Sequence, residues 1–268
     1  MNKRHQFVFA IAAASLVLAG CGSKSTAAKD AGVGENSGTT LTPKNFVSSI
    51  TAAQQKARSS HVEMTISASG QKFGASGDTE IGATAEDTTV KMLMDLGSSG
   101  MGKLEMRLIG STFYINLGPM SQNKFAKIDL KDSSNPMVGQ YGKFLDQLDP
   151  SKQIASFKAA MTDLNKKGAP ITIDGVKAQP YEMTLDTSKI ADTGGTGASS
   201  GVDIPKEVTY TMWVGPDNLP RRLVSELAGS DITVNYSKWG QPVDVKAPSK
   251  NEITTVDLTK MFGQLPSA

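Results

Sequence analysis

The stretch "HVEMTISAS", residues 61–69, alternates apolar and polar side chains with a period of two. Val62, Met64 and Ile66 stand at every second position, and the residues between them are polar. Successive side chains of a β-strand point to opposite faces of its sheet, so this alternation is typical of a strand with one packed face and one face in water. The stretch therefore predicts a β-strand whose Val62, Met64 and Ile66 side chains face inward.

The same period recurs along the chain in two groups of segments. The first group has glycines or short polar breaks between its members, which indicates neighbouring antiparallel strands in a meander. Its members are Phe73–Ile81, Thr88–Leu96, Met101–Ile109, Thr112–Leu117 and Lys124–Leu130. The second group is Ile171–Val176, Tyr181–Leu185, Val208–Val214, Arg221–Leu227 and Ile232–Tyr236. Asp174-Gly175 is expected to form a tight turn, and "GPDNLP", residues 215–220, a turn between two strands.

Apolar residues at three- and four-residue spacing predict amphipathic helices. One helix is expected to begin at the Thr42-Pro43 cap and to end near Arg58. A second is expected from Asp149-Pro150 to Lys166, with an apolar stripe of Ile154, Phe157, Met161 and Leu164. A further helix is expected over Val138–Leu148. Strands in two groups around a few helices predict the α+β class, with a long, curved antiparallel sheet and helices on one face.

The N-terminus has the order of a secretory signal peptide. Lys3 and Arg4 precede an apolar run from Phe7 to Ala19, and the single cysteine of the chain, Cys21, follows directly after. The run is shorter than the roughly 20 residues that a membrane-spanning helix needs, so a permanent anchor helix is the weaker alternative. The tetrad Leu18-Ala19-Gly20-Cys21 resembles the lipobox of bacterial lipoproteins. This resemblance implies that the Cys21 sulfur carries a diacylglyceryl group and anchors the mature chain on the extracytoplasmic face of the cell membrane.

Three regions follow from this organisation. Residues 1–20 are expected to be the signal peptide, residues 21–42 the lipidated cysteine and a flexible tether, and residues 43–268 a single domain. The whole chain has 28 basic and 26 acidic side chains, and the signal peptide removes Lys3 and Arg4 but no acidic residue. The mature chain is therefore formally neutral and lacks the basic field that nucleic-acid binding requires.

No catalytic arrangement is apparent in the sequence. His61 is the one histidine after the signal peptide, and no nucleophile motif surrounds it, so we expect a structural role for it. Glu63, Glu105 and Glu182 fall on the polar sides of their predicted strands, where solvation explains them. We therefore predict that the protein is not an enzyme and has no catalytic residues, no metal site and no cofactor.

Methionines are concentrated on the inward sides of the predicted strands. Methionine is flexible and polarisable, so it suits both an irregular packed core and a surface that accepts apolar ligands. Periodicity does not separate these two alternatives, because both need the same inward face. If the face lines a ligand cavity, the candidate lining residues are Met64, Ile66, Met92, Met94, Leu96, Leu104, Met106, Leu108, Phe113 and Ile115.

Five segments resemble the LppX/LprG-type lipoproteins of actinobacteria over about residues 46–248. They are "AAQQKARSSHVEMTISASG", "STFYINL", "FAKIDL", "YTMWVGPDNLPRRLVSEL" and "ITVNYSKWGQPVDVKAP". The resemblance implies a half-barrel, a strongly curved antiparallel sheet with helices on its concave face. It also implies an apolar cavity for the acyl chains of lipids or glycolipids that are moved toward the outer envelope. We further expect an envelope transport partner. The alternative is a solid-cored extracytoplasmic interaction or sensor module without a lipid ligand.

We expect Cys21→Ala to leave the precursor unlipidated and uncleaved by the lipoprotein pathway, because the substitution removes the acyl attachment atom. Metabolic labelling with a fatty-acid analogue checks this, and a labelled Cys21→Ala protein would contradict it. Deletion of residues 1–21 is expected to give a soluble domain, since the tether contributes no core.

Overall fold

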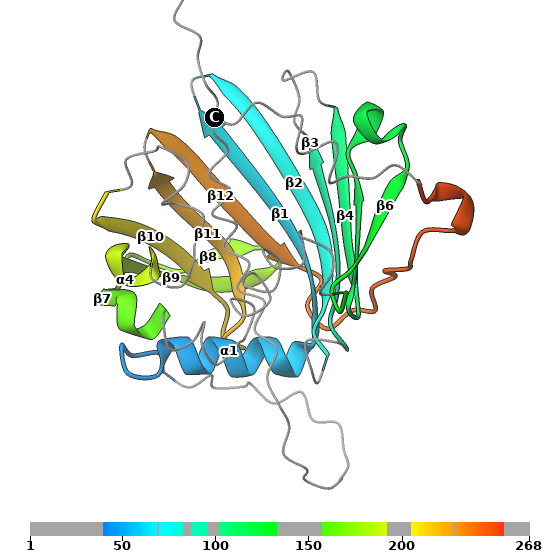
Figure 1. Cartoon of the computed structure of the whole chain (residues 1–268). Coiled ribbons are helices and arrows are strands. Elements are labelled where there is room, and N and C mark those ends of the chain that lie inside the picture. Colours follow the sequence, from blue (N-terminus) through cyan, green and yellow to red (C-terminus); the bar gives the residue numbers. More distant parts are fainter. Residues whose placement is uncertain are drawn as a thin grey trace, which may run out of the picture.

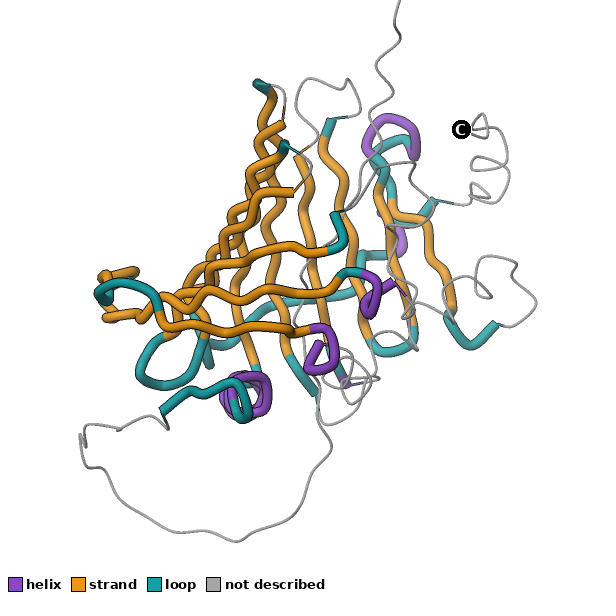
Figure 2. Tube along the Cα trace, turned by 90° about the vertical axis from the view of Figure 1, so that its left-hand side faces the viewer, coloured by secondary structure: helices purple, strands orange, loops and turns teal. Residues whose placement is uncertain are grey.

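The fold is a curved antiparallel sheet of 12 strands that does not close into a barrel. The computed structural model describes residues 40–68, 70–82, 87–95, 102–132, 157–191, 205–227 and 229–254. Figure 1 shows the strands side by side above one longer helix, and Figure 2 shows how their direction turns around the curve. The α+β class with a strongly curved antiparallel sheet is therefore confirmed.

The strand order is β6-β5-β4-β3-β2-β1-β12-β11-β10-β9-β7, and β8 pairs with β9 outside this path. The strands of the first half are β1 (Ser59–Ala68), β2 (Gln71–Glu80), β3 (Thr89–Asp95), β4 (Lys103–Ile109), β5 (Thr112–Asn116) and β6 (Phe125–Asp129). Those of the second half are β7 (Met161–Lys166), β8 (Ile171–Ile173), β9 (Val176–Asp186), β10 (Glu207–Val214), β11 (Pro220–Leu227) and β12 (Ser230–Ser237). The predicted meander corresponds to β1–β6, and β1 joins it to the second half by pairing with β12.

The longer helix, α1 (Phe46–Ala57), packs on the concave face of the sheet. It begins three residues after Pro43, because residues 43–45 form a turn in which the Asn45 side chain accepts hydrogen bonds from Thr42. The helix ends at Arg58, which adopts a left-handed conformation (φ 67°) and directs the chain into β1. Short helical segments complete the described part: η3 (Gly118–Ser121), residues 157–160, α4 (Ser188–Ala191) and η5 (Lys250–Glu252).

The predicted helix over residues 149–166 is wrong in its last third. Residues 157–160 are helical, but Met161–Lys166 is the edge strand β7, paired with β9. The register shifts between Met161 and Asp163, so Met161 lies opposite Leu185 and Leu164 opposite Met183. This bulge lets two residues three positions apart face the same side of a strand, which imitates helical spacing. Residues 149–156 and the expected helix over 138–148 lie outside the described residues.

Both predicted turns are confirmed. Asp174 and Gly175 have positive φ values of 47° and 78° and join β8 to β9, as a two-residue hairpin turn requires. In the β10–β11 turn, the amide of Gly215 donates to the carbonyl of Leu219 at 3.0 Å. The turn brings the Asp217 carboxylate next to Arg221, the second residue of β11.

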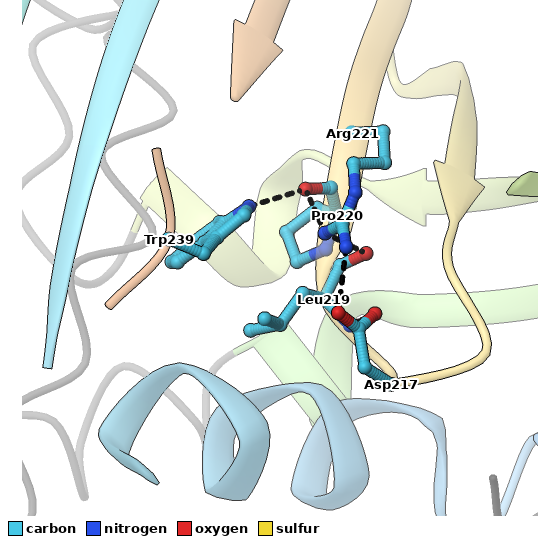
Figure 3. Close-up of polar contacts among 5 residues, drawn as sticks. All are labelled: Asp217, Leu219, Pro220, Arg221 and Trp239. Carbon is cyan, nitrogen blue, oxygen red and sulfur yellow. Dashed lines mark hydrogen bonds and ion pairs between the residues drawn. The ribbon is translucent and has the colours of Figure 1, made fainter. Parts of the chain in front are cut away.

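Arg221 is buried beside the turn of the β10–β11 hairpin (Figure 3). Its guanidinium lies 2.6 Å from the Asp217 carboxylate and also donates to the carbonyl of Leu219 at 3.2 Å. The indole Nε1 of Trp239, beyond the end of β12, donates to the carbonyl of Pro220 at 2.9 Å. These contacts connect the hairpin to the segment that follows β12.

We expect Asp217→Asn to lower the free energy of unfolding by about 1–3 kcal/mol, because it removes the carboxylate that pairs with a buried guanidinium. Asp244→Asn is the matched control. The Asp244–Lys246 pair is largely exposed on both sides, so its loss is expected to leave stability almost unchanged. Urea unfolding gives the free energy of unfolding of each variant. Equal losses of stability in Asp217→Asn and Asp244→Asn would contradict the expected role of the Asp217–Arg221 pair.

Candidate functional site

Strand register brings the predicted lining residues together on one face of the first half of the sheet. A first cross-strand row runs Val62, Gly77, Met92, Met106 and Ile115, from β1 to β5, with each residue opposite the next. A second row runs Met64, Ala75, Met94 and Leu104, from β1 to β4. A third runs Val90, Leu108, Phe113 and Ile128, from β3 to β6. We call these three rows, together with Ile66, the concave apolar face.

Nine of the ten residues predicted to line a cavity belong to this face. Ile66 lies opposite Phe73 on one side and Ile232 on the other. Leu96 lies outside the described residues. The structure therefore brings the described candidates onto one surface, and their contact with a ligand stays a prediction.

The second row continues into the other half of the sheet, where burial is much deeper. Met64 lies opposite Val234, Val234 opposite Leu223, and Leu223 opposite Met212. There the row joins a cluster that α1 covers, which we call the sealed cluster. Its buried members, between 1% and 8% exposed, are Phe46, Val47, Ile50, Leu164, Met183, Met212, Val214, Leu223, Val234 and Tyr236. Burial raises the pKa of the Tyr236 phenol, which therefore stays neutral there.

The concave apolar face is less well covered. Of the nine described candidates, eight are half-buried, and Ile115, at 9% exposed, is at the limit of burial. Ile115 packs with Leu117, Ala126, Ile128 and Leu130 in a small cluster at β5 and β6. One continuous sheet face thus has a sealed part under α1 and a partly exposed apolar part over β1–β4.

Two small residues shape the middle of this face, and sequence reasoning did not single them out. Ala75 and Gly77 on β2 lie between the bulkier side chains of β1 and those of β3. A Cβ atom added at Gly77 would lie 2.4 Å from the carbonyl oxygen of Lys91 and 3.0 Å from the Met92 sulfur. The Met92 thioether therefore lies over the space that Gly77 leaves free. A glycine at an inward position of a strand was the available signal for such a close approach.

Charged side chains occupy the opposite, convex face of the same strands. Nδ1 of His61 lies 2.6 Å from the Asp78 carboxylate, and Arg107 lies 2.7 Å from Glu105, which is 3.8 Å from Lys91. On β9, Glu182 pairs with Lys167 at 2.9 Å. These acids make ion pairs. In the described part of the chain, the ion-pair partners of His61 are the carboxylates of Asp78 and Glu63, and neither is a serine or cysteine nucleophile.

The C-terminal segment is attached to the convex face and to the β6 edge. Arg107 donates to the carbonyl of Lys246 at 2.8 Å, and its guanidinium lies 4.6 Å from the centre of the Phe125 ring. The amide of Thr254 donates to the carbonyl of Phe125, which belongs to β6. The contacts partly protect an otherwise open sheet edge.

The described residues hold neither a metal-ligand cluster nor a membrane-spanning helix. They contain no group of three or more histidine, cysteine, aspartate or glutamate side chains arranged to hold a metal ion. No helix in the described part of the chain is long and apolar enough to cross a membrane.

Comparisons with known proteins identify the fold. No family model matches the sequence, and no curated protein matches it significantly. Among solved structures, LprF from Mycobacterium bovis superposes with a TM-score of 0.53 at 15% identity, over 77% of this chain and 97% of that one. The Mycobacterium tuberculosis lipoprotein LppX gives a TM-score of 0.50 at 15% identity, over 76% of this chain and 99% of that one. At this identity the likeness shows a shared LppX-like fold.

We expect Gly77→Ala to destabilise the domain by about 1–3 kcal/mol, because its Cβ would overlap the β3 backbone at Lys91. Gly74→Ala is the matched control on the same strand, since a Cβ there meets no atom within 4 Å. Thermal melts of the two variants compare them directly. A Gly77→Ala protein as stable as Gly74→Ala would contradict the close packing of Met92 over Gly77.

Proposed function

We propose that this protein is a membrane-anchored extracytoplasmic lipoprotein that binds the acyl chains of lipids or glycolipids on its concave apolar face and helps to transfer them across the cell envelope. Cys21 holds it on the membrane, and the concave apolar face holds the chains. The protein carries out no covalent chemistry. A transport partner in the envelope supplies or receives the lipid.

The partial exposure of the concave apolar face is the observation that carries this proposal. Eight of its candidate residues are half-buried, whereas residues of the same sheet face under α1 are sealed. A contiguous, partly exposed apolar surface on a soluble domain is typical of a binding site. Burying an acyl chain there gains about 25 cal/mol per Å² of apolar area. Because this attraction is non-directional, we expect broad selectivity for chain length.

Two further observations support the proposal. The Leu18–Cys21 tetrad resembles a lipobox, and attachment of two or more acyl chains gives stable membrane anchoring. The shared fold includes LppX, which is itself a lipoprotein. Native mass spectrometry of the protein from a bacterial host tests the proposal: co-purified, non-covalent lipid supports a carrier. Protein without any bound lipid supports a solid-cored interaction module instead.

The second cross-strand row offers a matched pair of positions, Met94 and Met212. Met94 is half-buried, whereas Met212 is 1% exposed in the sealed cluster. We expect Met94→Trp to reduce bound lipid with little change in melting temperature, because the indole enters space that the ligand uses. Met212→Trp is expected to cost about 1–3 kcal/mol or more by overpacking.

Two measurements on Met94→Trp, Met212→Trp and Ile115→Trp check these expectations: the amount of bound lipid per protein and the melting temperature. Ile115 is nearly buried in the β5–β6 cluster, so an intermediate loss of stability is expected there. Equal destabilisation at Met94 and Met212, with no lipid on the parent protein, would contradict a binding face.

A further inference from the structure

Helix α1 buries two polar side chains on its apolar stripe. Gln54 is 1% exposed and Thr51 is 4% exposed. They share the buried side of the helix with Phe46, Val47 and Ile50, which belong to the sealed cluster. An amide and a hydroxyl at these positions do not contribute to the apolar packing that holds α1 on the sheet.

Neither side chain has a hydrogen-bond partner among the residues that the structure describes. In the described part of the chain, Nε2 and Oε1 of Gln54 and Oγ1 of Thr51 make no hydrogen bond, and each atom exposes less than 1 Å². Among the described residues, the buried Thr89 hydroxyl on β3 also lacks a partner. Ser59 and Ser225 show the usual arrangement: Ser59 donates to the carbonyl of Gln241 at 2.6 Å, and Ser225 to that of Thr209 at 3.0 Å. Buried polar groups normally have partners, because an unmade hydrogen bond is costly. A missing partner at Gln54 and Thr51 therefore needs an explanation.

The position of the pair suggests what that partner is. At the start of α1, the Phe46 ring lies 5.5 Å from the Tyr181 ring of β9. The other end of the helix leads through Arg58 into β1, and Figure 1 shows it at the base of β1 and β2. Gln54 thus lies toward the β1 end, where Val62 and Met64 contact the sealed cluster. These two residues begin the half-exposed rows, so the end of α1 that carries Gln54 leads into the strand on which the sealed cluster and the concave apolar face meet.

We propose that Gln54 and Thr51 bind the ester carbonyl and a neighbouring hydroxyl of a glyceryl lipid whose acyl chain lies on the concave apolar face. This inference rests on the proposed function. The Gln54 amide supplies a donor at Nε2 and an acceptor at Oε1, and the Thr51 hydroxyl supplies either. The ester carbonyl of the lipid accepts a hydrogen bond from Nε2 of Gln54, and the lipid hydroxyl donates one to Oε1 of Gln54. A plain hydrocarbon satisfies none of these atoms.

The same chemistry favours a neutral polar group over a charged one. The buried stripe of α1 carries no lysine or arginine. Burying a phosphate or a free carboxylate against neutral partners carries a large desolvation cost. The glyceryl ester region, rather than a charged headgroup, therefore fits this position. Because the amide is closed off from water, the ligand engages it after rotation of the Gln54 side chain, whose torsions move the amide without moving the helix backbone.

The test compares two probes of equal chain length, 1-monopalmitoylglycerol and hexadecane, on the full-length chain in a non-ionic detergent. Affinity is obtained from the rise in melting temperature with probe concentration. Gln54→Met keeps the side-chain length and removes the amide. Gln55→Met is the matched control at the next position of α1, which is only partly buried. Thr51→Val removes the hydroxyl at nearly constant shape and serves as a second variant if Gln54→Met does not fold.

We expect Gln54→Met to bind monopalmitoylglycerol about tenfold more weakly than the parent protein, with hexadecane binding unchanged. Without a probe, its melting temperature is expected to be equal to or above that of the parent, since an unpaired buried amide is gone. Gln55→Met is expected to leave both the affinity for monopalmitoylglycerol and the melting temperature without a probe unchanged. If Gln54→Met binds both probes equally more weakly, or binds both as tightly as the parent protein does, the proposed role of Gln54 is overturned. The carrier proposal then stays in place. A parent protein that binds neither probe would overturn the proposed function itself.

Discussion

The pairing of β1 with both β2 and β12 is the constraint on which the rest of the structure depends. The register sets Met64 opposite Ala75 on one side and Val234 on the other. Because side chains alternate along a strand, a slip of one residue at either ladder would turn one half of the apolar face outward. Correct register instead gives a single apolar surface that continues from the sealed cluster under α1 to the partly exposed rows of β1–β4.

The unequal cover of this surface follows from simple dimensions. A helix of 12 residues is about 18 Å long, and neighbouring strands are about 4.8 Å apart. Lying across the strands, α1 therefore spans about four inter-strand spacings, which agrees with the five adjacent strands that carry members of the sealed cluster, β12, β11, β10, β9 and β7. Methionine suits the remaining rows, because a flexible side chain packs adequately with or without an apolar ligand beside it.

Local alternation was sufficient to predict most strands and the inward phase of the candidate residues. Local alternation did not predict three features, and each omission has a physical reason. The β1–β12 ladder joins His61 to Ser237, and no local pattern reports so distant a pairing. The β7 bulge gave Met161 and Leu164 a helical spacing within a strand. Burial of Gln54 without a partner depends on how α1 sits on the sheet, which its amphipathic pattern does not specify.

The central claim is that acyl chains lie on the concave face of the first half of the sheet. Photo-crosslinking with a diazirine-bearing fatty acyl lipid, followed by peptide mass spectrometry, tests it most directly. We expect labels on Met92, Met94 and Met106, and none on Leu93, which alternates to the convex face and is 38% exposed. Labels confined to Leu93 and other convex residues, or spread equally over both faces, would contradict it.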